Sequence, residues 1–500
     1  MGSRCLDLGM GNRLRVGGWS ARHMKLVITF ILALFAVTAG GAVQAQDKLP
    51  VIRSTSSIVS IQDGDMYRPN IWRLVPEIKP DVYESQLKDG KPQRVTFITD
   101  LESISFWVEL GKKYDFIIQR GDDLCYTQIV GVKFVPAAVF DQKYQAANRG
   151  KMSIEIPEVY ELVNIAIAMT PIGIEDRNLV YKESEYYQRM REWFDKYNAH
   201  PLITTLESEL RQDLGRYFSL KMNGYAFEFD ARGRIVQSRI YDRTGFRGDA
   251  SNTLRPFLPL LQEFSDATNF REFYKQNAAT YREQIAFYRD TANIAEMKRW
   301  LDKNFPNQTG YDTYKIIFSP LVAYNQSTTW FESNGFRELQ PHVNFPYPQD
   351  VRRSYEPGTE AGQNVFRGNI VFTEINHGYI NPEAEKYGER ILKAINNRER
   401  WVDRARGPGY YAGIATFNEY LNWGLVSLRL LDYAPKDEQA RMIASVERMM
   451  TTRRGFPMFG EFNRFLVTLY RTRPAGATVA DLYPQIIGWF ERNNRHHGGM

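Results

Sequence analysis

The chain is poor in cysteine, with two in 500 residues. Cys5 lies in an N-terminal leader, so only Cys125 remains after it. A lone cysteine cannot form an internal disulfide, and it excludes a cluster of thiolate ligands for zinc. Because Leu124 and Tyr126 flank it in a strand-like run, we expect Cys125 to be a buried strand residue and not a nucleophile.

The sequence also lacks a basic stripe. The formal net charge is +6, and residues 1–45 contribute +4 of it, which leaves about +2 for the remaining residues. Proteins that bind nucleic acid carry clustered lysine and arginine on one face. We find no such cluster, so no nucleic-acid partner is expected.

Long apolar runs are confined to the leader. Leu26–Val37 is almost continuously apolar, Lys25 precedes it, and small residues lead to Val43-Gln44-Ala45. This is the layout of a secretory signal peptide, and the run is too short for a bilayer, which needs about 20 residues. We expect translation to start at Met24, cleavage after Ala45, no membrane span after cleavage, and a periplasmic or secreted protein.

The fold class predicted is α+β, with a leader at 1–45, a β-rich domain at 46–150 and a mainly helical domain at 151–495. In the first domain Ile104, Phe106 and Val108 alternate with polar residues, as in a half-buried strand. Two further strands flank the turn residues Arg120–Asp123, which predicts a hairpin. We interpret this domain as β-sandwich-like.

Helical periodicity begins at Pro157, a residue suited to the first position of a helix. Residues 225–241 predict a hairpin among the helices, and residues 312–346 predict a small antiparallel sheet. Helices are expected at about 157–167, 183–198, 202–219, 251–264, 267–289, 291–304, 365–380, 382–397, 413–432, 436–451, 458–471 and 478–493.

One stretch carries most of the functional information, Thr373-Glu374-Ile375-Asn376-His377. In an H-E-x-x-H helix the two histidines bind zinc from one face, and the glutamate activates the metal-bound water. Here the second histidine and the glutamate are present, and Thr373 stands where the first histidine would be. Glu374 is the candidate catalytic base, and His377 is a candidate zinc ligand. Asn381 and Pro382 are expected to begin the next helix.

A second helix supplies another candidate zinc ligand, Glu419, within the pair Asn418-Glu419. Glu419 follows His377 by 42 positions. A glutamate on the apolar side of a buried helix is costly unless it is paired or coordinated. We therefore expect the two helices to pack with Glu374, His377 and Glu419 converging, and Thr373 pointing to the same cleft.

These motifs resemble an uncharacterised family of secreted bacterial proteins with features of gluzincins, the zinc peptidases whose third ligand is a later glutamate. The resemblance covers roughly residues 155–435. Its further marks are Glu158–Glu161, Tyr186-Tyr187, His200-Pro201-Leu202 and Ser319-Pro320-Leu321. It implies a metallopeptidase-like fold, a zinc cofactor, and a peptide or protein substrate. Members often carry the complete H-E-x-x-H, from which this chain departs at Thr373.

Other residues are candidates for the wall of a cleft. His342 lies in an expected edge strand, where it either replaces the missing ligand or is an exposed strand histidine. Asn418 and the polar segment 325–329 could line the same cleft, or the segment is a turn. His200, before Pro201, is interpreted as structural.

Two functions remain open at this point. The chain is either an exported zinc peptidase in which Glu374 or His342 completes the metal shell with His377 and Glu419, or a binding protein. The binding protein would have a peptidase-like scaffold with a non-catalytic cleft, joined to a β-domain that docks a partner or glycan.

Overall fold

The computed structural model describes residues 49–64, 66–245, 251–308, 310–350, 358–407, 410 and 414–494. The expected signal peptide and its cleavage point lie outside these residues. The described chain forms two compact units that meet in sequence at Pro136 and Ala137. None of its described helices has the length and apolar character needed to cross a bilayer.

The first unit contains two four-stranded sheets that share one apolar core. Phe97 of one sheet stacks edge-on against Phe116 of the other, with ring centroids 5.0 Å apart. Cys125 is buried in this core, as predicted, and burial raises the pKa of its thiol. One sheet has the order β1 (Val51–Arg53), β7 (Lys113–Arg120), β8 (Asp123–Lys133) and β4 (Asp81–Leu87). The other has the order β3 (Met66–Arg73), β2 (Ile58–Asp63), β5 (Gln93–Ile98) and β6 (Ser103–Val108).

The predicted hairpin of this unit is confirmed. β7 and β8 pair antiparallel, from Lys113 opposite Val130 to Arg120 opposite Asp123. Gly121 in the turn has a φ of +59°, a left-handed conformation that glycine adopts without a steric penalty.

The boundary between the units lies earlier than the predicted residue 150. Residues 137–150, including α1 (Gln142–Asn148), belong to the second unit because their polar groups are satisfied there. Phe140 N–H donates to Ser333 Oγ at 3.2 Å, and Gln145 Nε2 donates to Asn334 O at 3.2 Å. Composition does not change at this point, so the sequence carried no sign of it.

The main sheet of the second unit has the order β13 (Ser327–Ser333), β14 (Phe336–Asn344), β12 (Thr313–Ser319) and β9 (Met152–Glu155). The expected antiparallel sheet is wrong in part. Only β13 and β14 pair antiparallel, whereas β14 with β12 and β12 with β9 are parallel. The β13–β14 turn is Asn334-Gly335, both with positive φ, which is the preferred chemistry of a two-residue hairpin turn.

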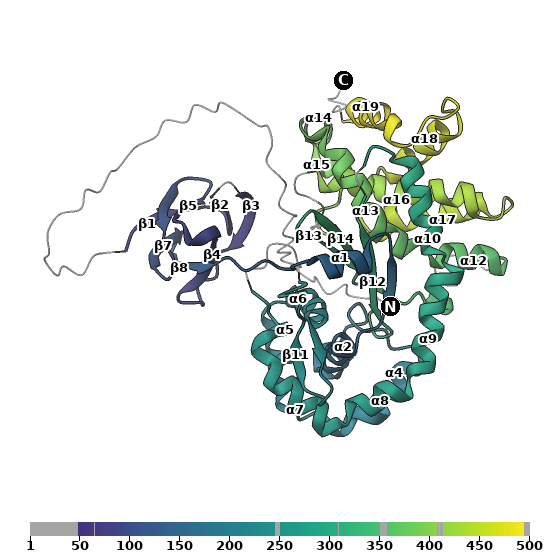
Figure 1. Cartoon of the computed structure of the whole chain (residues 1–500). Coiled ribbons are helices and arrows are strands. Elements are labelled where there is room, and N and C mark those ends of the chain that lie inside the picture. The colour runs from purple at the N-terminus through teal and green to yellow at the C-terminus, as the bar shows by residue number, and fades with distance from the viewer. Residues whose placement is uncertain are drawn as a thin grey trace, which may run out of the picture. The chain divides into compact units, whose positions relative to one another are not determined.

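The two faces of this sheet meet different helices, which Figure 1 shows above and below it. On one face, the α13 side, Leu339 lies so close to Gly378 of α13 that an added Cβ would be 3.3 Å from it. On the other face, the α2 side, the His342 ring lies 5.6 Å from the Tyr160 ring of α2. Leu339 and His342 are an odd number of residues apart on β14, so they point to opposite faces.

The helices follow the predicted segments, although several predicted helices are divided or shortened. They are α2 Glu158–Met169, α3 Pro171–Glu175, α4 Glu185–Phe194, α5 Pro201–Gln212, α6 Arg216–Asn223, α7 Leu258–Thr268, α8 Phe270–Gln276, α9 Ala278–Ala286, α10 Ile294–Asn304, α12 Glu360–Arg367, α13 Asn369–Glu385, α14 Gly388–Ala394, α15 Arg398–Trp401, α16 Ala415–Tyr433, α17 Gln439–Thr452, α18 Phe459–Arg471 and α19 Tyr483–Asn493. His200 caps α5, as a structural residue, by accepting a hydrogen bond from Leu202 N–H.

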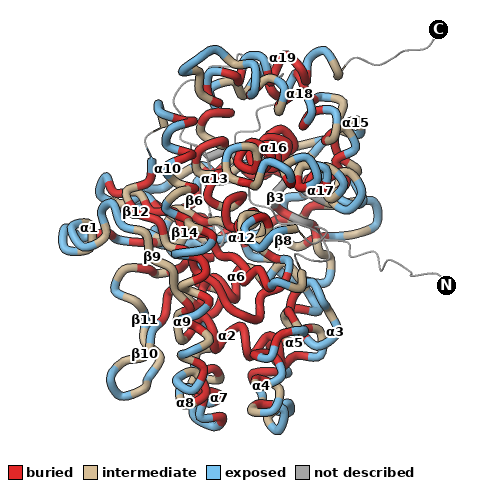
Figure 2. The backbone as a smooth tube through the Cα atoms, turned by 90° about the vertical axis from the view of Figure 1, so that its right-hand side faces the viewer, coloured by how far each residue is buried: buried red, intermediate tan, exposed pale blue. Residues whose placement is uncertain are grey.

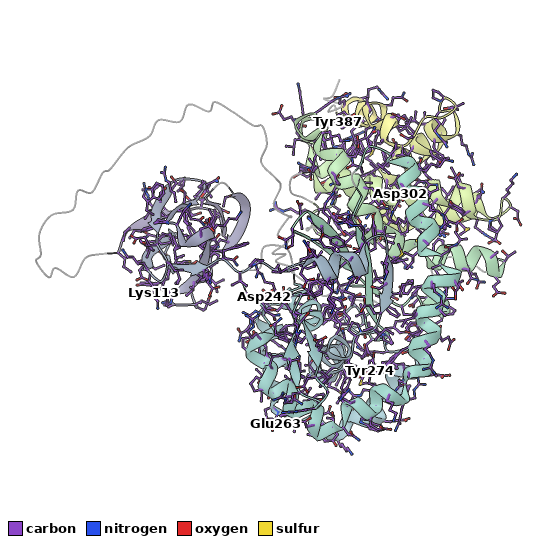
Figure 3. All side chains as sticks on the ribbon, in the orientation of Figure 1. Lys113, Asp242, Glu263, Tyr274, Asp302 and Tyr387 are labelled. Atoms are coloured by element: carbon purple, nitrogen blue, oxygen red, sulfur yellow. The ribbon has the colours of Figure 1, made fainter. Side chains whose placement is uncertain are left out.

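The expected helix start at Asn381-Pro382 is wrong, because α13 continues through Pro382 to Glu385. Packing holds this last turn in place. Tyr379 donates to Asp302 of α10 at 2.7 Å, and Asp302 is labelled in Figure 3. Tertiary contacts of this kind outweigh the backbone hydrogen bond that proline removes.

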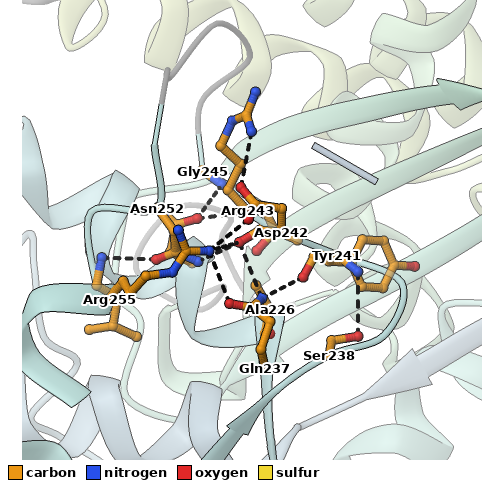
Figure 4. Close-up of polar contacts among 12 residues, drawn as sticks. Ala226, Gln237, Ser238, Tyr241, Asp242, Arg243, Gly245, Asn252 and Arg255 are labelled. Carbon is orange, nitrogen blue, oxygen red and sulfur yellow. Dashed lines mark hydrogen bonds and ion pairs between the residues drawn. The ribbon is translucent and has the colours of Figure 1, made fainter. Parts of the chain in front are cut away.

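The predicted hairpin of β10 (Phe227–Phe229) and β11 (Ile235–Gln237) leads to a polar loop on the α2 side. Figure 4 shows how that loop is fixed: Gln237 donates to Ala226 O and Tyr241 O, and Arg255 pairs with Asp242 at 2.7 Å. The loop thereby holds the Tyr241 hydroxyl 2.5 Å from Glu338 of β14.

Candidate functional site

Glu374 and His377 lie on α13, three residues apart and therefore on one face of the helix. Val371, Phe372 and Ile375 are buried on its apolar side. This apolar side anchors α13, so the two polar side chains are positioned by a rigid helix and not by a loop.

The second helix, α16, carries Glu419, Asn422 and Trp423 within one turn. It is buried from Thr416 to Leu430, as the continuous red of its tube in Figure 2 shows. α13 contacts α16 directly, because the Asn376 amide donates to the Asn422 carbonyl at 3.2 Å. Polar groups on such a helix must find partners within the protein.

A single amide joins His377 to Glu419. Asn422 Nδ2 lies 3.0 Å from His377 Nε2 and 3.4 Å from Glu419 Oε2. His377 Nδ1 lies 3.3 Å from Asn381 Oδ1. With the proton on Nδ1, His377 donates to Asn381 and accepts from Asn422, so both ring nitrogens are engaged.

Glu419 is held by a cation from the protein itself. Arg454, which follows α17, places Nη2 2.5 Å from Glu419 Oε1, and Trp423 Nε1 donates to the same oxygen at 3.0 Å. Glu419 is 3% exposed and the Arg454 side chain 31% exposed. Arg454 also donates to the Tyr410 hydroxyl at 2.7 Å and lies over the Trp423 ring. The carboxylate of Glu419 is therefore paired with a cation, and each of its oxygens accepts at least one hydrogen bond.

Glu374 contacts β13 instead of α16. Thr328 Oγ1 donates to Glu374 Oε2 at 2.7 Å. Burial raises the pKa of Glu374, and the nearby charge of Glu419 adds to this, while His377, Thr328 and Arg454 act in the opposite direction. Two neighbouring carboxylates favour protonation of one of them, and Glu374 is the one that is pushed toward its neutral form.

The structure places Thr373 and Asn418 on the same two helices, both buried. Thr373 Oγ1 donates to Ile370 O within its own helix at 2.7 Å, so its hydroxyl is not used by the site. Asn418 Oδ1 has no hydrogen-bond partner.

The prediction for His342 is wrong in both of its forms. β14 is an interior strand with β13 on one side and β12 on the other, and His342 is fully buried, so it is neither an edge residue nor an exposed one. It points to the α2 side, away from Glu374 and His377. It cannot complete a metal shell with them, because zinc ligands converge to about 2 Å from one point.

The donor set on the α13 side does not fit zinc as it is arranged. A zinc ion needs at least three protein ligands with free lone pairs. The Nε2 lone pair of His377 accepts from Asn422, and Glu419 holds Arg454. Within the residues that the structure describes, no three His, Cys, Asp or Glu side chains are grouped to hold a metal. The positive charge that a metal would bring is supplied here by a guanidinium.

Several residues of this cluster were missed from the sequence. Asn422 follows Glu419 by three positions, so helical spacing could have found it. Thr328 lies in the segment 325–329, which was left open between a cleft wall and a turn. Arg454 lies 35 residues after Glu419, and no local pattern marks it.

Comparison of the chain with protein-family models, with curated proteins and with solved structures gives no match. The gluzincin resemblance therefore stands on the sequence motifs alone, and the functional argument rests on the geometry of the residues above.

Proposed function

We propose that this chain is an exported, peptidase-like scaffold that binds peptides in extended form without cleaving them. On this proposal the first unit is a β-sandwich-like module and the second is the metallopeptidase-like domain. The observation that carries the proposal is the pairing of Glu419 with Arg454 and of His377 with Asn422, because both groups that would bind zinc already have protein partners.

The supporting feature for peptide binding is the edge strand β13. It pairs with β14 along one edge, and among the described residues no strand pairs with the other edge. An extended peptide can add to such an edge through main-chain hydrogen bonds. Thr328 lies on this strand and bonds Glu374, so a peptide along β13 would pass beside the cluster of Glu374, His377 and Arg454.

The polar groups of the cluster suit binding better than hydrolysis. Glu374 offers carboxylate oxygens, one of which accepts from Thr328, and Arg454, whose side chain is 31% exposed, offers N–H donors. With His377 and Glu419 already paired, the cluster has no free ligand set for the metal that activates water in a zinc peptidase. The site can therefore hydrogen-bond to peptide amides and carboxylates without hydrolysing the peptide.

The test uses fluorescein-labelled decapeptides of mixed sequence with the full chain. We expect saturable binding by fluorescence anisotropy, with intact peptide recovered by mass spectrometry in the presence of added zinc. The matched control is the same pool N-methylated at every residue, which has no backbone N–H group on either edge to pair with a strand and should not bind. Cleavage of the peptides that depends on zinc and on Glu374 would instead support the peptidase hypothesis.

A further inference from the structure

The α2 side of the main sheet contains buried polar groups that lack partners. Lys221 of α6 and Gln340 and His342 of β14 are each fully buried. His342 has no partner on either ring nitrogen, and Gln340 Oε1 has none. Lys221 Nζ donates to Asn325 O at 2.6 Å, which uses one of its three N–H groups.

Lys221 and His342 belong to one locality. The His342 ring contacts Tyr160 of α2, and an added Cβ at Gly224, just after α6, would lie 3.0 Å from Tyr160 Cα. Burial lowers the pKa of His342, and the positive charge of Lys221 lowers it further. Asn325, whose carbonyl accepts from Lys221, lies two residues before Ser327, and Ser327 pairs with His342 across β13 and β14. The Lys221 ammonium therefore lies beside the strand segment that carries His342.

The charge of Lys221 is not compensated by an ion pair. Within the described residues, no carboxylate oxygen lies within 4.0 Å of Lys221 Nζ. Burial lowers the pKa of Lys221 to about 7, and the charge of Glu374 acts weakly in the other direction. Glu374 is itself bonded to Thr328 and pushed toward its neutral form. The Lys221 ammonium donates to one carbonyl and lies over the rings of Tyr217 and Phe218, and the His342 imidazole has no hydrogen-bond partner. Vacant buried donors cost stability, so a polar guest is favoured here.

We propose that Lys221 and His342 bind a small monovalent anion, of the chloride type, enclosed between α2, α6 and β14. The ammonium supplies the charge and two N–H donors, and the neutral imidazole supplies one N–H donor. A small ion is indicated because Lys221 and His342 are both without solvent exposure. His342 lies on the opposite face of the sheet from the peptide site, and the tests below do not require peptide binding.

The first test is crystallographic and needs no variant. Crystals of the full chain grown in bromide should show an anomalous peak within hydrogen-bonding distance of Lys221 Nζ and a His342 ring nitrogen. A water in that place, an empty place, or bromide only at surface positions would overturn the proposal.

The second test is thermal unfolding in chloride against gluconate at the same ionic strength. The native chain should gain a few degrees in Tm in chloride, because a ligand that binds only the folded state stabilises it.

Lys221→Met should lose this chloride-specific gain. Lys315→Met is the matched control, since Lys315 lies on the same side of the sheet but donates to the Tyr225 hydroxyl, and it should keep the gain. If Lys221→Met fails to fold, His342→Phe tests the same loss, and an equal Tm of the native chain in the two salts would contradict the proposal.

Discussion

The two sides of the main sheet differ in whether their buried histidine and buried cation have protein partners. On the α13 side, each candidate zinc ligand already has a protein partner: Asn422 bonds His377, and Arg454 pairs with Glu419. On the α2 side, His342 has no partner and Lys221 has one. Candidate ligands that already hold protein partners are not free to bind a metal, whereas buried donors without partners favour a polar guest. Resemblance to a sequence motif therefore does not indicate where a ligand binds. The buried groups that lack hydrogen-bond partners are the better guide.

The largest effect is expected at the ion pair of the α13 side. Arg454→Met should lower the free energy of unfolding by about 3 kcal/mol, because it leaves the charge of buried Glu419 without a partner. The double variant Arg454→Met with Glu419→Gln should recover part of this loss, since no charge is then left behind. Chemical denaturation measures both.

The control for this pair is Arg453→Met, because Arg453 is the exposed neighbour in sequence. It should change stability by no more than about 0.5 kcal/mol. If Arg454→Met were as mild as Arg453→Met, the guanidinium would not be the cation that balances this site, and the contrast between the two sides would fail.

The next prediction concerns the pH dependence of stability, which a buried carboxyl group on the α2 side should produce. Glu161 of α2 is fully buried; burial raises its pKa from the usual 4.5 to about 7, while Ser319 and Tyr186 act in the opposite direction. The folded state then holds the proton more tightly than the unfolded state. Its contribution to stability is fully present below about pH 4.5 and is lost as the pH rises through about 7, by an amount on the order of 3 kcal/mol.

Glu161→Gln should remove this dependence, so the variant and the native chain should diverge in their stability profiles between about pH 4.5 and 7. Glu158→Gln, in the first turn of the same helix and partly exposed, should leave the profile unchanged. A native profile that rises with pH across this range, together with an unaltered profile for Glu161→Gln, would show that Glu161 does not titrate as described.

The smallest effect concerns Thr373, the residue in place of the first histidine of the motif. Thr373→Val should cost about 1 kcal/mol or less, because its hydroxyl bonds only Ile370 O within α13. Peptide binding should be unaffected. A large loss of peptide affinity would mean that Thr373 belongs to the site after all.

The sequence predicted the elements better than their arrangement. Alternation and turn residues located β7 and β8, and helical periodicity located α13 and α16, because those signals are local. The parallel pairing of β12 with β9 joins residues more than 150 positions apart, and no local pattern contains it. The same limit explains the error at His342, whose strand was placed at the edge although β13 covers it.

The residues of the candidate site also fall into two groups, those that a local sequence pattern predicts and those that only tertiary packing brings in. Glu374, His377 and Glu419 were found from helical spacing and a known motif. Asn422 was within reach of the same spacing, but it was overlooked because amides are not zinc ligands in this motif. Arg454 and Thr328 reach the site through tertiary packing alone, and no local pattern in the sequence links them to it.

The most direct measurement of the central claim is the zinc content of the full chain after exposure to zinc, gel filtration at neutral pH and mass spectrometry of the metal. With His377 and Glu419 occupied by Asn422 and Arg454, the account predicts far less than one zinc per chain, unchanged in His377→Ala. About one zinc per chain that disappears in His377→Ala would contradict it and restore the zinc peptidase hypothesis.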